Sequence, residues 1–314
     1  MKRRRFLTIG ATAAALAGIT WPDRRLVLDW RGSALGAHAS IRVVSTDEKQ
    51  SRRVLQSVVS EVDRLENIFS LYRPHSSLVR LNADGRLTRP PAELVDLMSI
   101  AHSLHERTGG AFDMTVQPIF ELFASHGGRM PDDAAVERAR EHVDSTAVDI
   151  GMTEIAFRRE GMKATLNGVA QGYITDRITD RLADMGLVDV IVDMGEIRAS
   201  GTRADGTSWQ VGIDGSDRRV ALNNRAIATS SPAGTVFEPT GRLHHLFDPA
   251  TGRPARRAAQ TTVTAPTATI ADGLSTAACN LDASAFDDLC RMMRAEVTAM
   301  MPLTKLQDDR ESSV

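Results

Sequence analysis

Apolar residues recur every three to four positions in four stretches of the chain, and each stretch predicts a helix. The first stretch forms one long amphipathic helix with the apolar positions Val54, Leu55, Val58, Val59, Val62, Leu65, Ile68 and Phe69. Pro90-Pro91 opens the second helix, and Thr108-Gly109-Gly110 ends it, because glycine readily adopts the left-handed conformation of a helix C-cap. The apolar face of this second helix holds Leu94, Leu97, Met98, Ala101 and Leu104. Residues 172–185 and about 271–293 are predicted to be helical as well.

Short β-prone runs separate these helices. Residues 26–30 and 37–44 predict two strands that flank a glycine-containing turn at 31–36. Further strands are predicted in the short apolar runs at 154–157, 163–166, 188–192, 209–213 and 226–228. The polar stretch 126–144 is predicted to be a surface excursion. Strands and helices follow one another without a regular βαβ alternation, which favours an α+β fold of mixed or antiparallel sheets with packed helices.

The N-terminus has the pattern of an export signal. Arg3-Arg4-Arg5-Phe6-Leu7 is a twin-arginine signature, and Ala15-Leu16-Ala17 fits a signal-peptidase site. We therefore expect a signal peptide over residues 1–17 and a soluble protein of the bacterial periplasm; a basic tail without a targeting role is the alternative. The uncharged run 8–20 is too short to span a bilayer, and no cysteine near the cleavage site indicates a lipid anchor. One domain is expected over 24–300, followed by a loose tail over 301–314.

Composition excludes several classes of protein. The 314 residues are 42% hydrophobic and 25% charged, with a formal charge of −2. Without residues 1–17, 34 Lys and Arg stand against 40 Asp and Glu, which argues against a nucleic-acid partner. Two cysteines cannot form a disulfide scaffold. Cys279 and Cys290 lie about 16 Å apart if their predicted helix is continuous, so both are expected to be free and buried.

The usual nucleotide and metal fingerprints are missing from the sequence, which has no GxxxxGK[ST], GxGxxG, CxxC or HExxH motif. His102 and His105 are three apart on a predicted helix, where the pair is either a metal site or one solvated helix face. Ser230-Ser231 could belong to a hydrolytic triad, but no GxSxG elbow supports that interpretation.

Four other segments are candidates for binding chemistry. Asp113 follows a glycine turn, residues 167–172 lead into a helix whose N-terminal amides suit an anion, and residues 245–254 collect His, Asp, Thr and Arg. Asp272 and Thr276 are four apart, so they share one helix face and offer the hard oxygen ligands that Mg²⁺ prefers. Each residue also has an ordinary structural reading: a turn former, a helix cap or a packed histidine.

Together, six segments in sequence order resemble the ApbE family of FAD:protein FMN transferases. They are GSALGA at 32–37, FSLY at 69–72 with SSLVRLN at 76–82, TGGAFDMTVQP at 108–118, GVAQGY at 168–173, HLFDPATGRP at 245–254 and ADGLST at 271–276. The chain departs from the family at Gln171, where lysine is usual, at 194–198, where paired glycines are common, and at 228–232.

The resemblance implies a single T-fold-like catalytic domain and a residue-by-residue site. Mg²⁺ would be held by Asp272, Thr276 and a backbone carbonyl near Gly168. The site for FAD, the substrate, would be lined by Leu35, Tyr72, Ala111, Phe112, Asp113, Thr165, Gln171, His245 and Leu246. His245 would be the base that activates the acceptor hydroxyl.

The implied reaction moves FMN from FAD onto a Ser or Thr of a flavoprotein and releases AMP. The implied acceptor belongs to a respiratory membrane complex or to nitrous oxide reduction. Two alternatives use the same site: an FAD pyrophosphatase that yields free FMN and AMP, and a non-catalytic flavin carrier or assembly factor.

Overall fold

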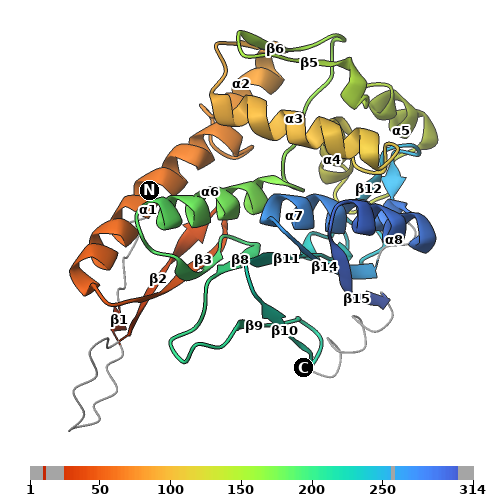
Figure 1. Ribbon diagram of the computed structural model, residues 1–314. Coiled ribbons are helices and arrows are strands. Elements are labelled where there is room, and N and C mark those ends of the chain that lie inside the picture. The colour runs from red at the N-terminus through yellow and green to blue at the C-terminus, as the bar shows by residue number, and fades with distance from the viewer. Residues whose placement is uncertain (1–9, 12–24, 256–258, 303–314) are drawn as a thin grey trace, which may run out of the picture.

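The computed structural model describes residues 10–11, 25–255 and 259–302. Its centre is an antiparallel sheet of eight strands in the order β1-β2-β3-β7-β8-β11-β14-β15 (Figure 1). The strands are β1 (Gly10–Ala11), β2 (Leu26–Ala34), β3 (Ala37–Ser45), β7 (Asp189–Asp193), β8 (Ile197–Ser200), β11 (Arg225–Ser230), β14 (Ala259–Ala265) and β15 (Glu296–Pro302). The rest of the predicted signal peptide and the tail beyond Pro302 lie outside the described residues.

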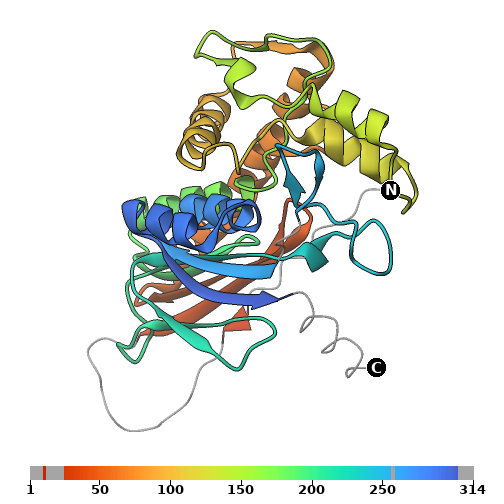
Figure 2. The same ribbon diagram turned by 90° about the vertical axis from the view of Figure 1, so that its right-hand side faces the viewer.

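Helices cover one face of this sheet, and a hairpin covers part of the other (Figures 1 and 2). The covering helices are α1 (Glu48–Phe69), α6 (Ala170–Asp184) and α7 (Ala268–Ala277), followed by the short η3 (Ala278–Asn280) and α8 (Ala283–Met292). The hairpin consists of β9 (Trp209–Gly212) and β10 (Arg219–Leu222). The main core lies between the sheet and the helices, where Leu55, Leu65 and Val190 are fully buried.

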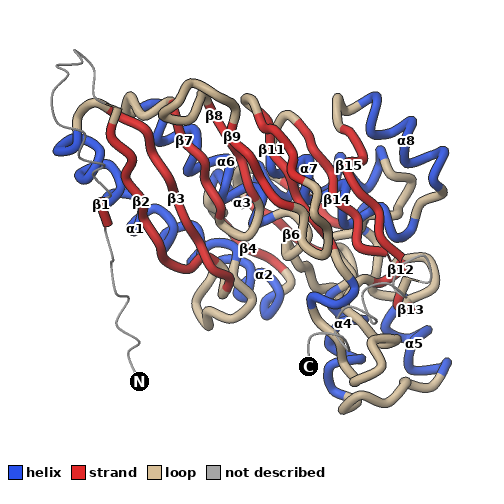
Figure 3. Tube along the Cα trace, turned by 90° about the horizontal axis from the view of Figure 1, so that it is seen from below, coloured by secondary structure: helices blue, strands red, loops and turns tan. Residues whose placement is uncertain are grey.

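A second layer stands above α1, α6 and α7 in Figure 1. It contains α2 (Ser77–Asp84), β4 (Arg86–Thr88), α3 (Ala92–Arg107), α4 (Gln117–Ser125), α5 (Asp133–Arg140), η1 (Ser145–Ala147), β5 (Val148–Ile150) and β6 (Glu154–Phe157). Strands β12 (Phe247–Asp248) and β13 (Arg253–Pro254) form a two-stranded sheet at the α4–α5 end of the molecule (Figure 3). The turn η2 (Pro232–Gly234) follows β11 in the chain. None of the helices among the described residues is long and apolar enough to cross a membrane.

The α+β class is confirmed, and the structure differs from the predicted elements in four details. The first turn is only Leu35-Gly36, because β2 continues to Ala34. Residues 163–166 do not form a strand: Ala164 N and O are both hydrogen-bonded to the side-chain amide of Asn82, and Thr165 N donates to Met114 O.

The other two differences concern helices. The polar stretch 126–144 contains α5, which begins with Asp132 as a side-chain N-cap. The predicted helix over 271–293 is broken at Leu281 and Asp282, whose backbones are extended, so α7 and α8 are separate. Cys279 and Cys290 are free and buried, as predicted.

Candidate active site

A pocket of about 570 Å³ opens where the β2–β3 hairpin, the loop after α3, the start of α6 and helix α7 meet. Its walls include every residue that the sequence nominated for the site: Leu35, Tyr72, Ala111, Phe112, Asp113, Thr165, Gly168, Gln171, His245, Leu246, Asp272 and Thr276. Segments up to 241 positions apart in the chain thus meet in one cavity, although their individual roles stay predictions.

The loop after α3 forms one wall, and its shape follows from two glycines. Gly109 and Gly110 have φ values of +60° and +86°, in the left-handed region that glycine adopts without a steric penalty. Thr108 Oγ1 accepts a hydrogen bond of 3.0 Å from Phe112 N, which closes the loop on itself. Asn280 Nδ2, from the end of η3, donates 3.0 Å to Ala111 O and ties the loop to the neighbouring wall.

Asp113 is held by donors on all sides. One carboxylate oxygen accepts from Thr115 N at 2.7 Å and from Thr115 Oγ1 at 2.5 Å. The other accepts from Ser145 N at 3.1 Å and lies 3.1 Å from His105 Nδ1. Only 3% of the Asp113 side chain is exposed, so its carboxylate holds the loop rather than facing a ligand.

The hairpin tip presents a strained residue to the pocket. Leu35 and Gly36 both have positive φ, at 46° and 84°, which is the geometry of a two-residue type I′ turn. A non-glycine residue pays about 1–2 kcal/mol for this conformation. Glu66 Oε1 accepts a 2.7 Å hydrogen bond from Leu35 N and is backed by an ion pair with Arg73, which holds the turn in place.

Asp272 forms the floor of the pocket on α7. Its Oδ2 accepts from Gly172 N of α6 at 3.0 Å, and the side chain is buried. A Cβ at position 172 would lie 2.4 Å from Ala268 O, so glycine lets the two helices approach closely. Burial raises the pKa of Asp272 to about 7, and the charge of Asp176 acts in the same direction.

Thr276 and Gly168 lie next to one another beside that carboxylate. A Cβ on Gly168 would come within 3.1 Å of Thr276 Oγ1, which shows how near the Gly168 backbone is to this hydroxyl. Ser230 Oγ lies 2.8 Å from Ser275 Oγ and 3.2 Å from Thr276 Oγ1. These contacts are the hydrogen bonds of the Ser230 side chain within the described chain, and Ser231 Oγ accepts from Ala233 N. No histidine is among these partners, so the structure does not support a serine triad.

Glu196 also lines the pocket, and sequence reasoning had not nominated it. Its Oε2 accepts a 3.2 Å hydrogen bond from Thr229 N where the β8–β11 ladder ends. Burial raises the pKa of Glu196 well above its usual range, and Asp272 raises it further. The available signal was its position in the segment 194–198, where the chain departs from the family pattern.

His245 also lines the pocket and has a defined tautomer. Its Nδ1 lies 3.1 Å from Thr235 O, and a carbonyl can only accept, so the ring hydrogen belongs on Nδ1. Nε2 then keeps its lone pair. Burial lowers the pKa of His245, partly offset by the bond to Thr235, so the ring is neutral near pH 7 and suited to accept a proton.

The ApbE family model matches residues 35–301. The chain belongs to the ApbE family. It is similar to the FAD:protein FMN transferase of Haemophilus influenzae, at 27% identity over 85% of this chain and 84% of the relative. The enzyme of the same name from Salmonella typhimurium is also 27% identical, over 86% and 82%.

Solved structures agree with this assignment. The apo crystal structure of the flavinyl transferase ApbE from Pseudomonas stutzeri matches with a TM-score of 0.77 at 25% identity, covering 86% of this chain and 90% of that one. The ApbE protein of Thermotoga maritima matches with a TM-score of 0.75 at 26% identity, covering 88% and 96%.

The charge of this ApbE-family pocket is one-sided. Glu196 and Asp272 line it, the Asp113 carboxylate is turned toward its own donors, and none of the walls within the described chain carries a Lys or Arg. A phosphate-containing ligand would meet carboxylates without a basic side chain to balance them, and hard oxygen donors next to one another suit Mg²⁺. No cluster of three His, Cys, Asp or Glu is found among the described residues, so a cation here would rely on Thr276 Oγ1 and the Gly168 carbonyl beside Asp272.

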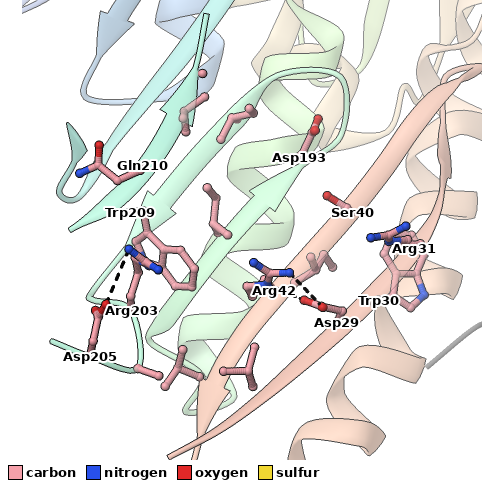
Figure 4. A pocket seen from close by; sticks show the side chains of 18 of the residues that line it. Asp29, Trp30, Arg31, Ser40, Arg42, Asp193, Arg203, Asp205, Trp209 and Gln210 are labelled. Carbon is pink, nitrogen blue, oxygen red and sulfur yellow. Dashed lines mark hydrogen bonds and ion pairs between the residues drawn. The ribbon is translucent and has the colours of Figure 1, made fainter. Parts of the chain in front are cut away.

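A larger groove of about 730 Å³ lies on the other face of the sheet, beside the β9–β10 hairpin (Figure 4). Four of its charged side chains form two ion pairs: Arg42 with Asp29 at 2.6 Å and Arg203 with Asp205 at 3.7 Å. None of the ApbE motif residues nominated for the site lines this groove.

Proposed function

We propose that this chain transfers the FMN moiety of FAD onto a Ser or Thr hydroxyl of a flavoprotein, with Mg²⁺ as cofactor and AMP as the leaving product. The observation that carries the proposal is the convergence of all twelve nominated residues on one pocket, which a neutral His245 and Asp272 both line. A volume of about 570 Å³ is within the range of about 300–1,000 Å³ typical of small-molecule sites.

The chemistry is the attack of the acceptor hydroxyl on the phosphoanhydride of FAD, which replaces the anhydride bond at the FMN phosphorus with a phosphoester bond. The acceptor oxygen forms a bond to the FMN phosphorus, the bond from that phosphorus to the bridging oxygen breaks, and AMP leaves with this oxygen. His245 Nε2 takes the hydroxyl proton. Such reactions depend mainly on positioning and on neutralising charge, and little covalent work falls to the protein.

The cation has a defined role in this proposal. Asp272, Thr276 and the Gly168 carbonyl would hold it, and when bound it offsets charge on the pyrophosphate oxygens. The residues of the chain position the substrate: the Ala111–Asp113 wall and Leu35 orient FAD. Gln171 lines the cavity at the position where other family members have lysine.

The setting of the reaction is inferred from the sequence alone. The twin-arginine signature supports export of the folded protein to the periplasm. We therefore propose that the acceptor is a periplasm-facing flavoprotein of a respiratory or nitrous-oxide-reducing membrane complex.

Intact mass spectrometry tests the reaction. The protein without residues 1–17 is incubated with FAD, Mg²⁺ and a flavoprotein domain that carries an acceptor Ser or Thr. We expect the acceptor to gain one FMN, and the gain to disappear when Mg²⁺ is chelated or when the acceptor residue is replaced by Ala.

The same reaction mixture separates the alternatives. Free FMN and AMP formed in the presence of the acceptor, without any gain of FMN by it, would identify an FAD pyrophosphatase. FAD that binds but is neither cleaved nor transferred to any tested acceptor would identify a carrier. Either result would contradict the proposed transferase.

A further inference from the structure

His105 lies in the last turn of α3, outside the pocket, and contacts the loop after α3 that forms one pocket wall. Its Nδ1 lies 3.1 Å from Phe112 O and 3.1 Å from Asp113 Oδ2. Both partners are acceptors, so a hydrogen on Nδ1 is shared between them. The pKa of His105 is raised, first by this bond to Asp113, as expected for an imidazole beside a carboxylate.

The main chain of His105 holds the same loop. His105 O accepts from Gly110 N at 2.9 Å and from Thr108 Oγ1 at 3.2 Å. The imidazole packs under Gly110, where an added Cβ would lie 3.7 Å from its Cε1. One residue therefore contacts the loop through its carbonyl, its Nδ1 and the edge of its ring.

We propose that His105 is a positioning residue for flavin binding, which fixes the Ala111–Asp113 wall by donating from Nδ1 to Phe112 O and to the Asp113 carboxylate. The inference rests on the proposed function, since the wall it fixes is the one expected to contact FAD. The Asp113 carboxylate is buried and turned toward its donors, so the wall meets a ligand through its main chain and Phe112. A shift of that wall weakens binding without removing any group that reacts.

The neighbouring His102 provides a matched control. It is one turn earlier on α3, its ring stacks on that of His105 at 6.4 Å, and its Nε2 lies 3.7 Å from Glu106 Oε1. None of the hydrogen bonds found within the described residues joins its side chain to the 108–113 loop.

The test compares three substitutions by FAD affinity and by steady-state kinetics. His105→Leu keeps most of the volume but removes the donor, and we expect Kd and KM for FAD to rise about tenfold with kcat within about threefold, as for the loss of one charge-assisted hydrogen bond. His105→Asn places an amide N–H near the position of Nδ1 and is expected to restore affinity to within about twofold of the parent. His102→Leu is expected to match the parent.

Several results would overturn the inference. A His105→Leu protein with the parent's FAD affinity, or a His105→Asn protein as weak as His105→Leu, would show that the shared hydrogen does not position the wall. If His105→Leu fails to fold, His105→Gln replaces it, because the glutamine amide lies near the position of Nε2 rather than that of Nδ1. Equal affinity of the Asn and Gln variants would then contradict the proposal. A parent protein that neither binds nor cleaves FAD would instead refute the proposed function itself.

Discussion

Two buried aspartates line the same pocket in opposite surroundings. Asp113, on the loop wall, accepts from Thr115 N, Thr115 Oγ1 and Ser145 N and lies against His105. Asp272, on the helical floor, accepts one hydrogen bond from Gly172 N, and no other is found for its carboxylate among the described residues. Its charged neighbours, Asp176 and Glu196, carry the same sign.

The contrast separates a structural carboxylate from one that needs a ligand. A carboxylate with a full set of donors is stabilised by the fold alone. A buried carboxylate with one donor and acidic neighbours is costly unless a proton or a cation joins it. The two aspartates should therefore respond differently to the same chemical change, Asp to Asn.

The largest effect is expected for Asp272→Asn. The amide oxygen can still accept from Gly172 N, so the fold is retained, but the negative charge that would hold a cation is lost. We expect Mg²⁺-dependent transfer to fall about 1,000-fold, in line with the loss of a main electrostatic stabiliser. Transfer is measured by the mass of the acceptor, and thermal unfolding checks the fold.

Asp287→Asn serves as the control for this change, because Asp287 is exposed on α8 and far from the pocket walls. Full activity of Asp272→Asn at saturating Mg²⁺ would remove the floor carboxylate from the cation site.

Replacing His245 tests whether transfer needs a base in addition to the negative charge of Asp272. His245→Gln retains a polar side chain without an imidazole lone pair, and we expect transfer to slow about 100-fold while FAD affinity is unchanged. His126→Gln is a matched control, since His126 Nδ1 also contacts a main-chain carbonyl, at 2.8 Å, outside the pocket. Single-turnover rates measure the chemical step; a rate equal to that of the parent would exclude His245 as the base.

Asp113→Asn should reverse the pattern seen at Asp272. The new amide NH₂ must face one of the donors around Asp113, which leaves a buried group without an acceptor, and stability should fall by about 1–3 kcal/mol. FAD affinity falls with it, and kcat at saturating FAD changes little. Urea unfolding measures the loss. A protein as stable as the parent would mean that the donors around Asp113 do not hold the loop.

Much of the fold follows from local patterns in the chain. The period of apolar residues predicted α1 and α3, and the two glycines after Thr108 do adopt the left-handed conformation expected of a helix end. The break at Leu281 was not predictable from apolar spacing, because no Pro or Gly marks it. Asn280 ends the first helical segment by donating to two carbonyls, Ala111 O and Phe247 O, from distant segments.

The site shows the same division between local and distant information. Motifs in sequence order nominated residues that do meet in one pocket, but their surroundings come from elsewhere in the chain. The donors that fill the Asp113 carboxylate include Ser145, 32 positions away. Glu196, between β7 and β8, interacts with Asp272 of α7. Residues 163–166 have the apolar pattern of a strand, yet the backbone of Ala164 is hydrogen-bonded to the side chain of Asn82 rather than to another strand.

The smallest expected effect is a coupling between pH and Mg²⁺. The folded state raises the pKa of Asp272 to about 7, above the ordinary 3.8, so it retains a proton that the unfolded chain has released between about pH 4 and 7. Stability from this group therefore falls as pH rises through that window. His244 has the opposite effect, because burial lowers its pKa from the ordinary 6.5 to about 4. The stability that this ring contributes therefore rises as the pH rises from about 4 to 6.5.

Because these contributions oppose one another, the informative quantity is the rise in Tm that Mg²⁺ produces at each pH. We expect a rise of a few degrees at pH 8, where the cation meets an ionised Asp272, and almost none at pH 5, where a proton competes for the same oxygens. In Asp272→Asn the rise should vanish at both values, while in Asp113→Asn it should persist at pH 8. An equal Mg²⁺ effect at pH 5 and pH 8 would mean that the cation binds away from the floor carboxylate, and the two aspartates would no longer differ in function.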